Sequence, residues 1–116
     1  MPRSYVPARG DVVWISMSPQ AGREQTGRRP ALVVSPKQYN AKVGLALMCP
    51  ITSQVKGYPF EVALPAGLPV QGVVLSDQIR SLDWRAREAG FVGKLPKERI
   101  IEALQKVGVL LSLEDM

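Results

Sequence analysis

Residues 18–29 form a polar segment whose side chains suit acid–base and electrostatic chemistry. Its candidate functional residues are Glu24, Gln25, Arg28 and Arg29. A carboxylate can accept a proton, and a guanidinium can stabilise a negative charge that develops during a reaction. Pro30 restricts the backbone directly after Arg29, so this arginine should be held better than one in mid-loop. Polar connections of this length are often functional, but a solvated loop whose charges maintain solubility explains the same residues equally well.

A second group of candidates follows a long apolar run. Thr52 and Ser53 carry hydroxyls that could donate to a phosphate oxygen, although such residues more often satisfy backbone groups at the end of a strand. Lys56, Tyr58 and Phe60 then combine a cation with aromatic rings, a mixture that suits phosphate contact and base stacking. Of the two rings, we expect that of Phe60 to belong to the hydrophobic core.

The third group of candidates lies between residues 77 and 87. It consists of Asp77, Gln78, Arg80, Arg85 and Arg87. Asp77 and Gln78 could contact base edges, while the arginines could hold phosphates, because the guanidinium fork matches two phosphate oxygens. A turn at the end of a strand, with Trp84 anchoring a dimer interface, explains this region equally well. An exposed Trp84 would also favour dimerisation.

Composition narrows the chemistry that these groups could perform. The 116-residue chain has no His, so the usual general base near neutral pH is missing. Its single cysteine, Cys49, can form no internal disulfide and no zinc site of the Cys/His type. Fifteen Lys and Arg residues against ten Asp and Glu residues give a net charge of +5, which favours a polyanionic partner.

Length and hydropathy predict one domain that spans residues 1–116. A hydrophobic content of 46% is enough for one modest core. No apolar run approaches the roughly 18 residues of a membrane-spanning helix. The first residues also lack the apolar stretch of a signal peptide. We therefore expect a cytoplasmic protein without a membrane partner.

Cleavage of RNA by its own 2′-hydroxyl is the reaction that the candidate groups suit best. It needs a proton acceptor, a group that stabilises the dianionic phosphorane and help for the leaving 5′-oxygen, but neither a metal nor a cofactor. Glu24 is the available base, Arg29 the charge stabiliser and Thr52 a positioning donor. Arg29 is also assigned the general-acid role, which is unfavourable because a guanidinium ordinarily has a pKa above about 12.

The elements that must position these residues are short and mostly β. Apolar and β-branched runs predict strands at residues 11–17, 31–35, 43–51, 60–64 and 72–75, with 80–83 as a further strand or an extension of the last. Closely spaced turn residues separate them, which is typical of a small antiparallel barrel. Residues 35–40 predict a helical turn with Ser35 as N-cap. A C-terminal helix begins after Pro96 and runs to about Leu111. Its predicted buried positions are Ile100, Ile101, Leu104, Val107 and Leu111.

The chain resembles the MazF/PemK family of type II toxin–antitoxin ribonucleases, above all its chromosomal MazF branch, from about Tyr5 to Leu111. The motifs that carry the resemblance are Gly10-Asp11-Val12-Val13-Trp14, residues 24–31, Ser35-Pro36 with Tyr39-Asn40, Pro50-Ile51-Thr52-Ser53, residues 56–62, Ser76-Asp77-Gln78 and Ser81-Leu82-Asp83-Trp84-Arg85. Each motif is weak by itself, but their order and spacing together are specific.

The resemblance implies an SH3-like barrel of the PemK/Kid/CcdB type and a homodimer that binds single-stranded RNA along its interface. It implies sequence-specific cleavage without metal or cofactor, leaving 2′,3′-cyclic phosphate and 5′-hydroxyl ends and so inhibiting translation. Arg29 and Thr52 match the catalytic pair of the family, and Glu24 matches the nearby acidic position. Asn40, in one of the matching motifs, joins the RNA-binding candidates. The implied partner is a MazE-like antitoxin with an acidic tail, through which the protein would contact DNA only indirectly.

Two alternatives remain open at this point. A CcdB-like toxin shares the fold but acts on gyrase through a C-terminal Trp-Gly-Ile end, whereas this sequence finishes Ser112-Leu113-Glu114-Asp115-Met116. An RNA-binding module that has lost catalysis is the other alternative, and the presence of Glu24, Arg29 and Thr52 argues against it.

Overall fold

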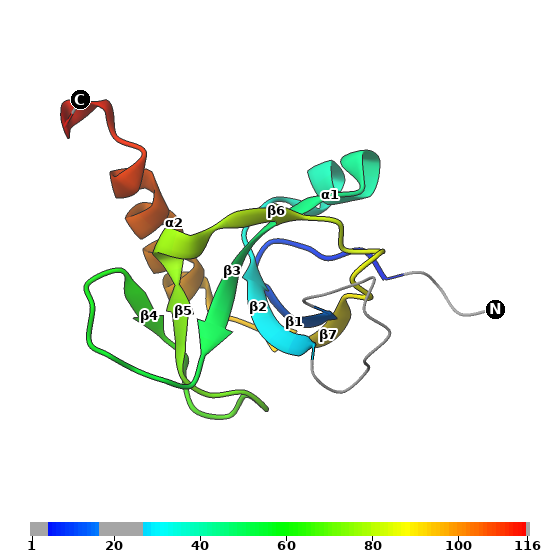
Figure 1. Ribbon diagram of the computed structural model, residues 1–116, viewed down its shortest axis with the longest axis horizontal. Coiled ribbons are helices and arrows are strands. Elements are labelled where there is room, and N and C mark those ends of the chain that lie inside the picture. Colours follow the sequence, from blue (N-terminus) through cyan, green and yellow to red (C-terminus); the bar gives the residue numbers. More distant parts are fainter. Residues whose placement is uncertain (1–4, 17–26, 116) are drawn as a thin grey trace.

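The computed structural model describes residues 5–16 and 27–115, and within them short strands dominate (Figure 1). The strands are β1 (Asp11–Ser16), β2 (Arg28–Val33), β3 (Ala46–Thr52), β4 (Glu61–Ala63), β5 (Val73–Leu75), β6 (Arg80–Leu82) and β7 (Gly90–Lys94). The helices are α1 (Lys37–Val43) and α2 (Lys97–Leu110), with 3-10 turns η2 (Ser76–Gln78) and η3 (Leu113–Asp115). The predicted class, mainly β with a C-terminal helix, is confirmed.

The strands form an antiparallel sheet in the order β4-β5-β3-β2-β1-β7. Strand β3 joins its two parts, because one edge pairs with β2 while the other pairs first with β6 and then with β5. A strand shared in this way curves the sheet, so the described strands make an open, barrel-like structure in place of a flat layer.

The core has two parts because β1, β2 and β3 are buried on both faces. Successive residues of a strand point to opposite faces, so Val12 and Val13 belong to different clusters. The first cluster lies under α2 and includes Leu32, Cys49, Val74, Ala103 and Val107. The second includes Ile15, Ala31, Val33, Met48, Leu82 and Trp84.

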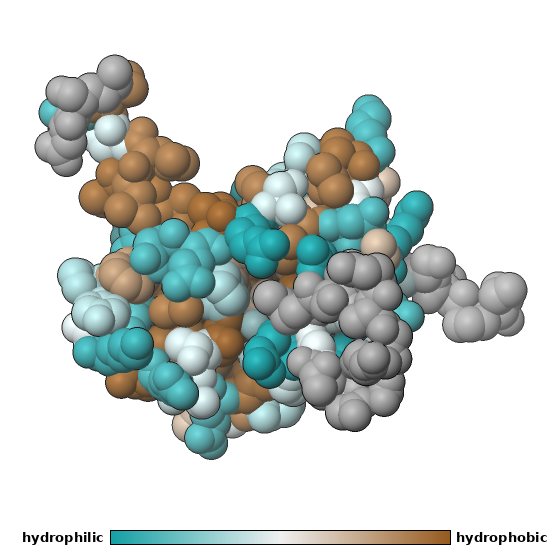
Figure 2. Space-filling view, viewed as in Figure 1, coloured by the Kyte–Doolittle hydropathy of each residue, from teal (hydrophilic) through white to brown (hydrophobic). Residues whose placement is uncertain are grey.

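Helix α2 begins after Pro96 as predicted, but fewer of its apolar residues are buried than the sequence pattern indicated. Ala103 and Val107 are buried, whereas Ile101 is 43% exposed and Leu111, just past the helix end, is 73% exposed. The outer part of α2 projects from the body of the molecule and carries apolar residues (Figures 1 and 2). Neither described helix combines the length and the hydropathy that a bilayer crossing requires.

Two local predictions are wrong in detail. Pro36 precedes the first turn of α1 without a side-chain cap, so Ser35 is not the N-cap. Val43 belongs to α1 and not to the following strand, which begins at Ala46. Strand β7 was not predicted, because two glycines among its five residues weaken the pattern of a strand.

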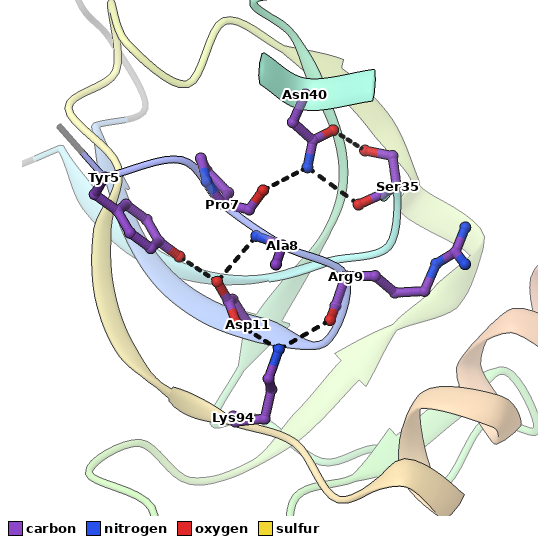
Figure 3. Close-up of polar contacts among 8 residues, drawn as sticks. All are labelled: Tyr5, Pro7, Ala8, Arg9, Asp11, Ser35, Asn40 and Lys94. Atoms are coloured by element: carbon purple, nitrogen blue, oxygen red, sulfur yellow. Dashed lines mark hydrogen bonds and ion pairs between the residues drawn. The ribbon is translucent and has the colours of Figure 1, made fainter. Parts of the chain in front are cut away.

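A polar network fastens the N-terminal segment to the sheet (Figure 3). The Tyr5 hydroxyl and the Ala8 amide both donate to Oδ2 of buried Asp11, at 2.5 and 2.9 Å. Lys94 Nζ lies 2.9 Å from Asp11 Oδ1 and also donates to the Arg9 carbonyl. Burial, followed by the hydrogen bond to the Asp11 carboxylate, raises the pKa of Tyr5 above its ordinary value, so the phenol is a proton donor that stabilises the strand.

Candidate functional site

A cleft of about 700 Å³ opens where β2 and β3 separate. Its lining includes Arg29, Thr52 and Ser53, three of the residues predicted to perform chemistry. Arg29 and Ser53 are exposed and Thr52 is half-buried. The cleft has the volume of an ordinary ligand site. The structure therefore brings together a guanidinium and two hydroxyls that are more than twenty residues apart in sequence.

Strand register explains why Arg29 and Thr52 share this cleft. Ala31 pairs with Pro50 in the antiparallel ladder of β2 and β3. Continuing that register by two residues on each strand places Arg29 opposite Thr52. Gly72 packs against the same end of β3, and its φ of +121° together with overlap of any Cβ with the Thr52 carbonyl restricts this position to glycine.

Two smaller hollows adjoin the cleft and extend it in different directions. One, of about 150 Å³, shares Thr52 and Gln54 with the cleft and is also lined by Lys56, Tyr58 and Gln78. The other, of about 120 Å³, has a mostly apolar lining to which Gln78 and Arg80 add polar groups. We call the cleft and these two hollows together the groove. Its polar and basic lining can contact a phosphodiester backbone and its bases.

The aromatic pair beside the groove differs from the prediction. Phe60 is only half-buried and does not join either core cluster. Its ring stacks on that of Tyr58 with centroids 5.2 Å apart, and both line the smaller hollow that contains Lys56. The expected assignment of Phe60 to the core is therefore wrong, and both rings offer a surface for stacking.

Arg28 lies in the cleft but is already bound to the backbone. Its guanidinium donates to the carbonyls of Glu88 at 3.0 Å, Arg87 at 3.4 Å and Trp14 at 3.5 Å. These contacts fasten the turn 84–88 to the end of β1. The structure thus gives Arg28 a positioning role in the fold beside its place in the cleft.

Asn40 and Trp84 require correction, because both belong to the interior. The Asn40 side chain is fully buried, accepts from the Ser35 hydroxyl and donates to the carbonyls of Pro7 and Ser35 (Figure 3). Trp84 is 4% exposed and its Nε1 donates to the Asn40 carbonyl at 3.0 Å. Asn40 therefore cannot contact RNA in this conformation, and Trp84 does not anchor an interface.

The other predicted residues that the structure describes do not line the groove. Asp77 is exposed on η2 but lines none of the three hollows. Arg85 packs its guanidinium over the Trp84 ring at 4.9 Å, and Arg87 donates to the Ser16 carbonyl at 3.0 Å. Glu24 and Gln25 fall outside the described residues.

Two groups that line the cleft were given no role from the sequence, although one of them, Gln54, ends the candidate segment 50–54. Gln54 follows Thr52 and Ser53 in the same turn, and its backbone N–H donates to Thr52 Oγ1 at 3.1 Å. Trp14 belongs to the continuous apolar run 12–15, and buried Val12 lies two residues before it on the same face of the strand, so no sequence signal indicated that its ring is 37% exposed. Gln54 was within reach of sequence reasoning, because its amide extends the polar group that Thr52 and Ser53 begin.

A cysteine nucleophile can be set aside on physical grounds. Burial, and to a smaller extent the charge of Asp77, raises the pKa of the Cys49 thiol to about 12. A thiol of that pKa carries almost no thiolate at neutral pH.

Among the described residues, no three His, Cys, Asp or Glu side chains gather as metal ligands.

Comparison with known proteins gives consistent matches over nearly the whole chain. Residues 8–111 match the family described as PemK-like, MazF-like toxin of type II toxin–antitoxin system. The endoribonuclease toxin MazF of Escherichia coli strain K12 is 47% identical over 107 residues, covering 92% of this chain and 96% of that protein. The structure of MazF (Form-I) from Deinococcus radiodurans matches with a TM-score of 0.84 and 56% identity, covering 93% of this chain and 98% of that one. The MazE–MazF (Form-II) structure from the same organism matches with a TM-score of 0.86 and 49% identity, covering 96% and 100%.

Proposed function

Because the chain belongs to the PemK-like, MazF-like toxin family, we propose that residues 1–116 form the toxin of a type II toxin–antitoxin system, an endoribonuclease that cleaves single-stranded mRNA at selected sequences. The observation that carries this proposal is the cleft in which Arg29 and Thr52 meet. The relatives that match along most of the chain are named endoribonucleases. The proposed place of action is the bacterial cytoplasm, where mRNA is translated.

The proposed mechanism uses the 2′-hydroxyl of the RNA as nucleophile. Its proton passes to the Glu24 carboxylate, the 2′-oxygen bonds to phosphorus, and the bond from phosphorus to the 5′-oxygen breaks. Arg29 stabilises the charge on the phosphorane, and the Thr52 hydroxyl donates to a non-bridging oxygen. The leaving 5′-oxygen takes its proton from Arg29 or from water in the open cleft. The products are a 2′,3′-cyclic phosphate and a 5′-hydroxyl, and translation stops as mRNA is cut.

The proposed partners are a second copy of the chain and a MazE-like antitoxin. An acidic antitoxin tail would occupy the basic groove in place of RNA, and the MazE–MazF structures of the Deinococcus proteins support such a pairing. Contact with DNA would be made only through the antitoxin. Apolar side chains exposed near the end of α2 support the homodimer, since water-exposed groups of this kind favour burial in an interface. They are Val109, Leu110, Leu111 and Leu113, and Ile101 is also exposed nearer the start of the helix.

The experiment that tests the proposed function is digestion of a long single-stranded RNA, and of the matching duplex, by the purified protein in EDTA. We expect discrete cuts in the single strand alone, with cyclic-phosphate and 5′-hydroxyl ends at every site. Absence of cleavage by a folded protein free of antitoxin would contradict the proposal, and a gyrase supercoiling assay would then test the CcdB-like alternative.

Lys56→Ala is expected to weaken binding of single-stranded RNA and to reduce its dependence on salt. The Lys56 side chain is exposed and lines the groove, so it can neutralise one phosphate. Loss of one such contact lowers the slope of log Kd against log salt by about 0.7. Fluorescence anisotropy at several salt concentrations measures the slope, with exposed Lys97→Ala on α2 as the control. An unchanged slope for Lys56→Ala would show that Lys56 makes no phosphate contact.

A further inference from the structure

Glu61 is a buried carboxylate that the proposed mechanism does not use. It begins β4, where a charged residue of a half-buried strand ordinarily faces water, yet it is only 8% exposed. Its Oε1 accepts from the Gly57 amide at 3.0 Å and its Oε2 from the Lys56 amide at 3.2 Å. Both oxygens are therefore engaged by consecutive backbone N–H groups, which satisfies a charge that would otherwise be costly to bury.

These hydrogen bonds fix the shape of the loop 53–60, which forms no strand pairing in the described structure. The Glu61 amide also donates to the Tyr58 carbonyl at 3.1 Å, and Gly57, directly before Tyr58, has a φ of +81°. The loop carries Lys56 and the stacked rings of Tyr58 and Phe60 into the groove. The orientation of all these side chains depends on where the Glu61 carboxylate holds the backbone.

The start of β4 is in turn fastened to two other elements. Lys106 on α2 donates from Nζ to the Glu61 carbonyl at 2.7 Å, and the same ammonium lies 3.1 Å from the Glu102 carboxylate. The Phe60 carbonyl accepts from the Ser76 amide at the start of η2, the turn that carries Gln78. The backbone at the start of β4 is thus held by α2 and η2, and the Glu61 carboxylate connects the loop to this fixed point.

We propose that Glu61 is a positioning residue for RNA: it holds Lys56 and the Tyr58–Phe60 pair in the arrangement that binds the nucleotides beside the scissile bond and selects their bases. This inference rests on the proposed function. Glu61 borders the same small hollow as Thr52, but both of its oxygens accept from the backbone of the loop that carries Lys56. Loss of the carboxylate should therefore affect RNA affinity and base selection, and leave the chemical step intact.

Glu61→Gln is the first test, because the amide keeps the shape of the side chain while placing an NH₂ group against one of the two N–H donors. We expect KM for single-stranded RNA to rise about tenfold, as for loss of one charge-assisted hydrogen bond. We expect kcat to stay within about twofold, as for loss of uniform binding. Sequencing of the cut ends should show additional cleavage sequences. Glu98→Gln, on the exposed first turn of α2, removes the same charge as a control and should change none of these quantities.

Gly57→Ala perturbs the same loop without touching the buried carboxylate. A Cβ at Gly57 meets no atom within 4 Å, but the φ of +81° is unfavourable for an L side chain. Gly44 at the end of α1 has a φ of +83° and equally open surroundings, so Gly44→Ala is a closely matched control outside the groove. Gly57→Ala should raise KM and relax the cleavage sequence, and Gly44→Ala should do neither. Comparison of Gly57→Ala with Gly44→Ala also tests the role of the loop if the Glu61→Gln protein does not fold.

The inference is overturned if the folded loop variants lose thermal stability while KM and the cleavage sequences stay those of the wild type. A fall in kcat at unchanged KM would overturn it as well, because it would place Glu61 in the chemical step. A wild-type protein that does not cleave RNA would contradict the proposed function alone. In that case Kd for the same single-stranded RNA replaces KM, and an unchanged Kd in both loop variants overturns the inference.

Discussion

Arg29→Ala is expected to lower kcat for RNA cleavage by at least about 100-fold, the usual effect of removing a group that stabilises transition-state charge. The guanidinium is exposed in the cleft, so little packing is lost, and the free energy of unfolding should change by less than about 0.5 kcal/mol. Single-turnover cleavage of a short labelled RNA at saturating protein measures the chemical step, and chemical denaturation measures stability.

Arg99→Ala is the matched control, since it removes the same charge from α2, where Arg99 pairs with Glu102 at the surface. Single-turnover rates should therefore separate the two variants although their net charges are equal. Retention of near-wild-type cleavage by Arg29→Ala would remove Arg29 from the catalytic role. If instead RNA affinity fell strongly while the rate at saturation did not change, Arg29 would be a binding residue only.

The sequence supplied Arg29 and Thr52 as candidate catalytic residues, but not that they line one cleft. Residue type and the following Pro30 indicated Arg29, and the change from apolar to hydroxyl residues after the third strand indicated Thr52. Their juxtaposition depends on the register of β2 against β3, a non-local pairing that is fixed by packing of the whole sheet. The sequence alone therefore supplied two candidates, and the strand register gives the reason to treat them as one site.

Glu61 shows where pattern analysis fails. A strand with one face in water should alternate polar and apolar residues, and Glu61 fits the polar position of that pattern. In the structure the loop 53–60 folds back over this face and presents two amides to the carboxylate. The Glu61 carboxylate can be buried because backbone amides of this irregular loop donate to it. The periodicity of a strand carries no information about donors from another segment.

Asn40 illustrates the opposite error. A polar residue in a motif of the resembling family was assigned to RNA, but its amide satisfies the backbone of the N-terminal segment and of Ser35 inside the protein. Similarity of sequence identifies positions that matter without saying whether they serve the fold or the ligand. Burial decides between the two, and it is known only from the structure.

Trp84→Ala is expected to lower the free energy of unfolding by about 3–5 kcal/mol, the usual cost of removing a large buried aromatic side chain. The ring is 4% exposed and packs in the cluster that contains Val13 and Met48, and its removal deprives the Asn40 carbonyl of the buried Nε1 donor. Urea denaturation followed by circular dichroism measures the change. All variants must be compared at one protein concentration, because a dimer gains stability with concentration.

Trp14→Ala is the control, because it removes the same side chain from a position that is 37% exposed on the neighbouring strand β1. We expect a loss below about 1.5 kcal/mol there, since less apolar area leaves water on folding. Size-exclusion chromatography separates stability from association. A Trp84→Ala protein with wild-type stability that elutes as a monomer would restore the interface interpretation of Trp84. Loss of stability in a protein that elutes like the wild type places the residue in the core, where its indole holds the segment around Asn40 against the strands that carry Arg29 and Thr52.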